Sequence, residues 1–548
     1  MSLLADIFGY LTVVLHGFSL VAETLTLGGI AFLLLLALPF AAALGEGGAA
    51  LRRRSFALLA WSAFAAALLE AAELALNATV LASSLDFARI LGAGFFEAGL
   101  AKILVCLALF VAALRPKPGA EWLLLVLGAG MMAASLAASH AAARLEDRTL
   151  LLGLTLLHRV AAGLWIGGIP YFLIGLHLCP RPPDRLRIGR RFSAMAMGAV
   201  AALLVGGLGL AFILIGSFPA LYGTAYGMMV LTKSLLFLGL LFLGFLNNRL
   251  IRRLARDPAT PTHRLLRFCE VEIGIGVAVL LAAASITSLP PAIDLVQDRV
   301  TLEDYAERLA PRWPSFESPA FSSLAIAQRQ AELDRTAAAT QAPHHEAFVP
   351  GGTAPLPRNA ADIAWSEYNH HWAGVFVLAI GLLALAERAG IAPWARHWPL
   401  LLLGLAFFLF FRSEAESWPI GELGFFESLR NPEFVQHKFF MLLIVLFGLF
   451  EWAVRTERLK GKGYALVFPL LVAGGAAFLL GHSHMLTNVK ALLLAEVTHL
   501  PIALLGVAIA AARWLELRLE PPGSRIAAWV WPPCFVLVGI ILLLYRES

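Results

Sequence analysis

The sequence has 548 residues, of which 59% are hydrophobic and 14% are charged. Soluble domains carry roughly 25% charged residues, so this composition excludes an ordinary soluble protein and indicates an integral membrane protein. The formal net charge of +5 is spread over short loops, which argues against a nucleic-acid-binding surface. The first nine residues lack a positive region and a cleavage site, so no signal peptide is expected.

Long apolar runs predict an all-α membrane protein with about fourteen transmembrane helices, since the strands of a β-barrel would alternate polar and apolar residues. The first eight helices are expected at 8–41, 55–82, 98–114, 121–140, 150–178, 192–216, 226–248 and 268–290. The last six are expected at 368–387, 397–411, 434–453, 464–482, 490–512 and 526–545. A polar segment, 293–366, divides the chain into predicted membrane domains 1–292 and 367–548 and is expected to contain short helices at the membrane interface.

The loops between these helices alternate in basic content. One set of loops holds 25 Lys or Arg residues and the short loops of the other set hold six. Cytoplasmic loops carry the excess of basic residues, so the first set is expected in the cytoplasm and both chain termini outside.

Eleven of the fourteen histidines then fall on the outer side, and only His177, His263 and His397 fall on the inner side. Imidazole keeps a lone pair for metals and is uncommon inside membrane helices unless it has a function. Three histidines on three helices of the first domain are predicted to converge on a metal ion, with two methionines as soft donors for Cu(I) and one glutamate to orient a ligand or relay protons. These residues are His16, His140, His158, Met131, Met132 and Glu23. The alternative for any one of them is a structural hydrogen bond between helices.

The second domain repeats this pattern more densely. A ring of outer-side histidines is predicted to hold copper or, as a bis-histidine pair, a b-type haem. Its members are His371, His437, His482, His484 and His499, and His370 precedes the first of them. Several of these residues have the simpler interpretation of a position at the wet membrane interface. His344, His345 and Glu346 lie in the polar segment, where a solvated position is favoured over metal capture.

Buried charges form a further candidate pathway. Glu70 and Glu73 share one face of the second helix, and Lys233 lies inside the seventh. Such groups usually face a pathway or a partner, so a transport role and a structural ion pair, for instance of a second-helix carboxylate with Lys233, stay open. On the inner side His177 and Cys179, with Cys269 at the start of the eighth helix, are a candidate Cu(I) exit site, although isolated cysteines are more often small hydrophobic residues.

Four ordered motifs carry a resemblance to a known family. They are HRVAAGLWIGG (158–168), RRFSAMAMG (190–198), GTAYGMMVLTKSLLFLGLLFLGFLNNR (223–249) and LLRFCEVEIGIGVAVLLAAASITSLPPA (265–292). Over about residues 1–292 the chain resembles the bacterial copper-resistance protein D family (CopD, PcoD). The resemblance implies eight membrane helices, copper movement across the inner membrane, a periplasmic partner of the CopC type and a match of His140 and His158 to the family's histidines. Residues 367–548 look like an extension found in longer relatives.

We therefore expect a multi-pass protein of the bacterial inner membrane, with periplasmic termini, that takes copper at periplasmic histidines for passage towards the cytoplasm. It is expected to be a transporter rather than an enzyme. The alternatives are a membrane b-type cytochrome or metalloreductase with haem in the C-terminal helices, and a chaperone-like factor that metallates an oxidase. The sequence shows no P-loop, so ATP is not an expected partner.

Overall fold

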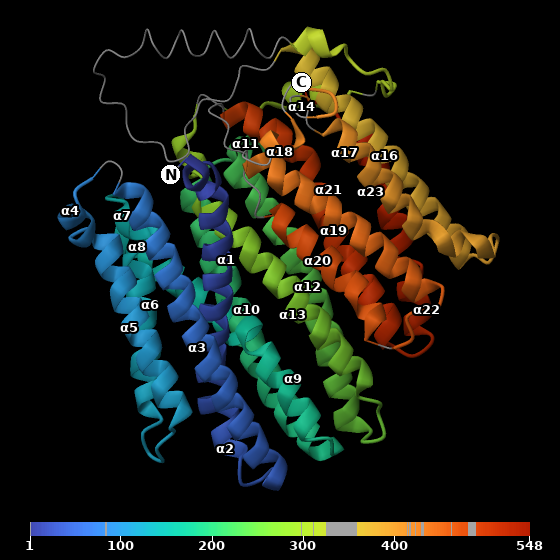
Figure 1. Ribbon diagram of the computed structural model, residues 1–548. Coiled ribbons are helices and arrows are strands. Elements are labelled where there is room, and N and C mark those ends of the chain that lie inside the picture. Colours follow the sequence, from blue (N-terminus) through green and yellow to red (C-terminus); the bar gives the residue numbers. More distant parts are fainter. Residues whose placement is uncertain are drawn as a thin grey trace.

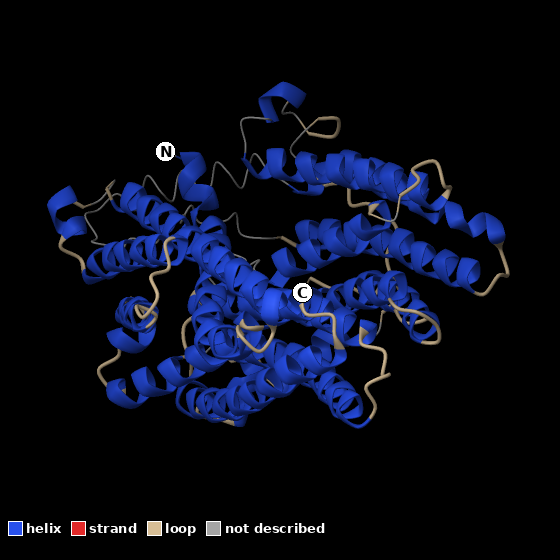
Figure 2. Cartoon of the chain, turned by 90° about the horizontal axis from the view of Figure 1, so that it is seen from below, coloured by secondary structure: helices blue, strands red, loops and turns tan. Residues whose placement is uncertain are grey.

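A computed structural model describes residues 2–547 apart from 83–84, 297–298, 311, 325–358, 414, 416–417, 422–423, 429–431, 462 and 481–488. Throughout this described part, the regular elements are helices, which run mostly antiparallel (Figure 1; Figure 2). Each of the fourteen predicted segments corresponds to helix in the structure. Twelve described helices are long and apolar enough to cross a membrane, and Trp122–Ala137 and Tyr464–Leu480 are shorter apolar helices. The prediction of a multi-pass α-helical membrane protein is confirmed.

The N-terminal set of helices reaches from the first residues to Thr287. It consists of α1 (Ser2–Phe32), η1 (Leu33–Ala37), α2 (Leu38–Phe40), α3 (Gly45–Leu81), α4 (Phe87–Leu91), α5 (Gly94–Leu114), α6 (Trp122–Ala137), α7 (His140–Ala143), α8 (Arg148–Ala162), η2 (Gly163–Gly167), α9 (Ile169–Leu178), α10 (Pro182–Ile215), α11 (Phe218–Gly223), α12 (Ala225–Arg256) and α13 (His263–Thr287). Two of these elements, η1 and η2, are single π-helical turns inside long helices.

The C-terminal set begins after the polar segment. It consists of α16 (Ala360–Arg388), η5 (Pro393–Leu400), α17 (Leu401–Arg412), α18 (Phe425–Ser428), α19 (Pro432–Arg455), η6 (Tyr464–Leu466), α20 (Val467–Leu480), α21 (Val489–Arg518), α22 (Gly523–Ala528) and α23 (Trp531–Leu543). Both ends of the chain lie at the same end of the bundle, and α2 lies at the opposite end (Figure 1). This agrees with the predicted arrangement of the termini, and the membrane side that they face stays a prediction.

The two sets of helices share a core. The largest hydrophobic cluster extends from α1, α3 and α13 to Leu480 on α20 and Leu500 on α21. Polar contacts join the same helices, because Ser285 donates to the carbonyl of Leu480 at 2.7 Å and Arg518 pairs with Glu270 at 2.9 Å. The helix α13 is therefore a main element through which the C-terminal helices pack on the N-terminal ones, with α12 beside it, whereas the predicted division into two domains stays a prediction.

The described part of the polar segment forms short helices, η3 (Ala292–Asp294), α14 (Leu302–Leu309) and η4 (Phe321–Leu324), and their place at the membrane interface stays a prediction. A capping box of Thr301 and Asp304 begins α14. The ammonium of Lys490 on α21 pairs with Asp304 at 2.8 Å and, with the hydrogen bonds from Thr301, lowers the pKa of that carboxyl to about 2. These contacts tie the segment to the end of the bundle that holds the chain ends.

The backbones of α1 and η2 approach each other closely at two glycines. A Cβ atom at Gly28 would lie 2.1 Å from the carbonyl carbon of Gly167, and a Cβ at Gly167 would lie 1.9 Å from the carbonyl oxygen of Thr24. Small residues allow membrane helices to pack this closely, which explains the WIGG part of the motif at 158–168. A similarly close contact at a glycine joins α16 to α23, where a Cβ at Gly539 would lie 2.4 Å from the backbone nitrogen of Leu378.

The contact between Gly167 and α1 leads to a prediction about stability. Gly167→Ala forces α1 and η2 apart, and we expect it to lower the free energy of unfolding by about 1–3 kcal/mol, the usual cost of overpacking. The matched control is Gly198→Ala on α10, because a Cβ there meets open space. Thermal unfolding of both variants in the same detergent is the measurement, and equal midpoints for the two variants would contradict the assignment of this contact.

Candidate functional site: a buried charge network

A row of polar side chains lies on one face of α1. His16, Ser19 and Glu23 stand three and four residues apart, so the helix repeat stacks them on one side. They extend along about 10 Å of the helix axis at 1.5 Å per residue. Ser19 and Glu23 are buried. A single apolar helix thus presents a polar face to its neighbours α3, α5 and α6.

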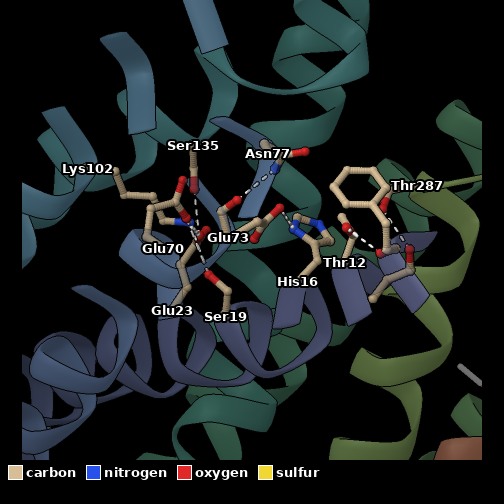
Figure 3. Close-up of polar contacts among 12 residues, drawn as sticks. Thr12, His16, Ser19, Glu23, Glu70, Glu73, Asn77, Lys102, Ser135 and Thr287 are labelled. Carbon is tan, nitrogen blue, oxygen red and sulfur yellow. Dashed lines mark hydrogen bonds and ion pairs between the residues drawn. The ribbon is translucent and has the colours of Figure 1, made fainter. Parts of the chain in front are cut away.

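Lys102 on α5 is the centre of this network (Figure 3). Its Nζ lies 2.8 Å from Glu70 Oε2 and 3.0 Å from Glu23 Oε2, and it donates to Ser19 Oγ at 3.4 Å. The side chains of Lys102 and Glu23 are 7% and 3% exposed. One ammonium therefore holds carboxylates of two different helices away from lipid and water.

Glu23 has two further partners. Ser135 on α6 donates to Glu23 Oε2 at 2.5 Å, and Arg159 Nη1 on α8 lies 3.6 Å from Glu23 Oε1. With Glu70 and Glu73 the network contains three carboxylates and two permanent cations, which leaves one formal negative charge. A region with this charge attracts a further cation.

His16 and Glu73 form the end of the network nearest the start of α1. His16 Nδ1 lies 3.3 Å from Glu73 Oε1, and Asn77 donates to the backbone carbonyl of Glu73 at 2.8 Å (Figure 3). The other ring nitrogen of His16, Nε2, is buried and has no partner among the described residues. A carboxylate that orients an imidazole whose second nitrogen is open is the usual arrangement behind a histidine metal ligand.

The sequence pointed to some of these residues and missed others. His16, Glu23, Glu70 and Glu73 were predicted, and the structure brings them into one network. Lys102, its central cation, was not predicted, nor were Arg159, Ser19 and Ser135. The available signal was a lysine within an apolar helix, but the predicted start at residue 98 placed Lys102 near the membrane surface.

His158 and Lys233 form a second contact, between α8 and α12. Lys233 Nζ lies 3.5 Å from His158 Nε2, and His158 Nδ1 is buried with no partner in the described part of the chain. The suggested structural pair of Lys233 with a second-helix carboxylate is therefore wrong, because the carboxylates of α3 face Lys102 and His16 instead.

The predicted convergence of three histidines stays a prediction. Within the described residues, no three His, Cys, Asp or Glu side chains form a group that could hold a metal ion. The side chain of His140 lies outside the described part, and Met131 and Met132 are buried at 0% and 3% exposure.

The C-terminal histidines differ from one another in their contacts. Both ring nitrogens of His371 face backbone carbonyls, Nδ1 that of Ser315 at 2.9 Å and Nε2 that of Tyr545 at 3.0 Å. Both ring nitrogens of His371 thus have partners in the protein, and its predicted role as a metal ligand stays a prediction. His482, His484 and the polar-segment residues His344, His345 and Glu346 lie outside the described residues.

His370, the residue before His371, lies near His499, another histidine of the predicted C-terminal ring. Its ring centroid lies 6.2 Å from that of His499 on α21, and it stacks on Tyr545 at 3.8 Å. His370 Nδ1 bonds to the carbonyl of Ser366 at 2.8 Å, which directs Nε2 away from its own helix. His437 lies on α19, and its predicted role stays untested.

Two residues of the predicted Cu(I) exit site on the inner side, His177 and Cys179, are close in sequence. His177 is bonded through Nδ1 to the carbonyl of Leu173 in its own helix at 2.9 Å. Cys179 is buried just past α9, and burial raises the pKa of its thiol. No further His, Cys, Asp or Glu joins them in a ligand group among the described residues, so this pair offers no ready-made ligand set.

Comparisons with known proteins point to one family. Residues 186–286, which include most of α10 and all of α12, match the model of the family described as copper resistance protein D. The "Copper transport protein CutJ" of Bacillus subtilis (strain 168) is 37% identical over 164 residues, which are 29% of this chain and 29% of that protein. The chain thus matches less than a third of that relative's length, and no solved structure matches it. The resemblance seen in the motifs is confirmed, since residues 186–286 are similar to the copper resistance protein D family.

Proposed function

We propose that this protein carries copper across the membrane, from the end of the bundle where the chain ends lie towards the opposite end. The observation that supports this most is the buried network in which Lys102 joins Glu23 and Glu70. Ionisable groups within a membrane are costly and usually mark a substrate or ion pathway. The names of the matching family and of the relative make copper the cargo that we propose for this pathway.

His16 is the first ligand on the proposed route. Glu73 orients its imidazole through Nδ1, and Nε2 is the nitrogen that would bind the incoming ion. A copper ion at Nε2 adds a positive charge beside a network with an excess of carboxylate. The attraction is therefore greatest where the ion enters the membrane.

Lys102 controls whether the copper ion moves on from His16 to the next carboxylates. Its ammonium occupies the position between two carboxylates in which a cargo cation would bind. A copper ion reaches Glu23 and Glu70 only as Lys102 moves aside, so the lysine prevents free passage of other cations. Exchange of one cation for another also keeps the binding neither too weak to load nor too strong to release.

The remaining predictions belong to this proposal. His140, His158 and the His370–His499 pair are proposed as further copper contacts at the outer end, and a CopC-type protein as the periplasmic donor. The distribution of basic loops supports placement in a bacterial inner membrane with periplasmic termini. Haem b is the alternative cofactor from the sequence, and an absorption spectrum without a Soret band in the purified protein would remove it.

A first prediction concerns the entry ligand. His16→Ala and Glu73→Gln are each expected to weaken copper binding by about tenfold or more, since loss of a partner of a metal ligand usually costs 10- to 100-fold. Copper uptake into proteoliposomes and copper titration of the purified protein are the measurements. The control is His397→Ala, because this histidine lies on the inner side of the predicted topology and bonds to Trp452. Uptake that is equal in all three variants and the wild type would rule out His16 as the entry ligand.

A second prediction concerns the central lysine. Lys102→Met leaves two buried carboxylates without their main cation, and we expect a loss of about 3–5 kcal/mol in the free energy of unfolding. Adding Glu23→Gln and Glu70→Gln to this variant is expected to restore most of the stability but not copper uptake. Thermal unfolding and uptake are measured together, with Lys117→Met in an exposed loop as control. Full uptake in the triple variant would show that the network is structural only.

A further inference from the structure

A second buried polar cluster lies in the inner half of the bundle, apart from the network around Lys102. Asn247 on α12 donates through Nδ2 to Glu272 Oε2 at 2.8 Å and to Cys269 Sγ at 3.7 Å, both on α13. The thiol of Cys269 also contacts the carboxyl group of Glu272. Asn247, Cys269 and Glu272 are 6%, 0% and 3% exposed. All three lie within the segment that matches the copper resistance protein D family.

The cluster contains a carboxyl group without a cation. Among the described residues, no Lys, Arg or His contacts Glu272. The adjacent charged residues pair elsewhere, because Glu270 bonds to Arg518, Arg267 and Trp514 on the other side of α13. A buried carboxylate without a counter-charge is costly in a membrane, so the cluster is suited to an added monovalent cation.

The surroundings of the carboxyl group leave its oxygen accessible to an added atom. Gly244, one turn from Asn247 on α12, presents no side chain, and a Cβ there would lie 3.5 Å from Glu272 Oε1 and 3.6 Å from Trp165 Cζ2. The carbonyl oxygen of Asn247, Oδ1, is buried and has no partner in the described part of the molecule. The cluster thus combines a sulfur donor, a carboxyl oxygen and an unused amide oxygen.

We propose that Cys269, Glu272 and Asn247 form a binding site for Cu(I) on its way to the inner side. Thiolate sulfur is the soft ligand that selects Cu(I). As the ion binds, the thiol proton of Cys269 passes to the carboxylate of Glu272, so that the thiolate–copper pair and the carboxyl group are each neutral. Cys269 lies about 9 Å and Glu272 about 14 Å along α13 from its start at His263, at 1.5 Å per residue. That end of α13 is opposite the chain ends, so the site follows the Lys102 network along the membrane normal. The proposal rests on the proposed copper transport and names a residue-level site for its cargo.

The experiment isolates Cys269 from the other thiols. A background variant carries Cys106→Ala, Cys179→Ala and Cys534→Ala, so that Cys269 is its only cysteine. This full-length protein and its Cys269→Ser derivative, which keeps the size of the side chain, are loaded with Cu(I) under reducing, anaerobic conditions. Copper X-ray absorption reports Cu–S scattering, and a competing Cu(I) chelator reports affinity. Thermal unfolding shows whether each variant is folded.

The expected result is Cu–S scattering in the background variant and its loss in the Cys269→Ser derivative. Glu272→Gln in the same background is expected to weaken Cu(I) binding by at least the roughly tenfold cost typical for a partner of a metal ligand. Unchanged scattering and affinity in folded Cys269→Ser and Glu272→Gln proteins overturn the site, and the cluster is then only a hydrogen-bonded contact between helices. If the wild type transports copper in this case, the proposed function stands without the site. A wild type that neither binds nor transports copper overturns both proposals.

Discussion

The ion pairs of Lys102 are the interaction on which the N-terminal helices depend. Water is absent from the hydrocarbon region, so a carboxylate there needs a cation or a proton. Glu23 and Glu70 belong to different helices and meet the same ammonium, which fixes α1, α3 and α5 relative to one another. A purely apolar contact would give similar stability without the charge, and this is why we connect the network with cation transport.

The element η2 links this outer network to the inner cluster. Gly167 brings the π-helical turn against the backbone of α1, one residue past Glu23. Trp165 in the same turn lies beside Gly244, where it faces the surroundings of Glu272. π-helical turns inside α-helices are frequent at functional sites. A shift of this turn would therefore alter the packing around both polar clusters at once.

The lengths of the apolar runs predicted the helices well, because such a run is a property of consecutive residues. The polar partners were harder to predict, because pairing depends on which helices become neighbours. Lys233 seemed available to the carboxylates of α3, yet α12 places it against His158. His371 was predicted as a ligand, and no feature of the sequence showed that backbone carbonyls face both of its ring nitrogens. Asn247 lies beside Asn248, and Glu272 lies two residues after Glu270, so nothing in their spacing indicated that the two side chains meet.

The two polar clusters differ in donor chemistry in a way that suits one direction of transport. The outer network offers imidazole and carboxylate groups, whose affinity for Cu(I) is moderate. The inner cluster adds the sulfur of Cys269, a softer donor that binds Cu(I) more tightly. An ion that enters at His16 would therefore find stronger ligands as it moves inward, and the neutral amide of Asn247 would not oppose it. On the proposed route, release then requires a stronger thiol acceptor beyond the start of α13, and the reducing cytosol that the proposed topology places there contains such thiols.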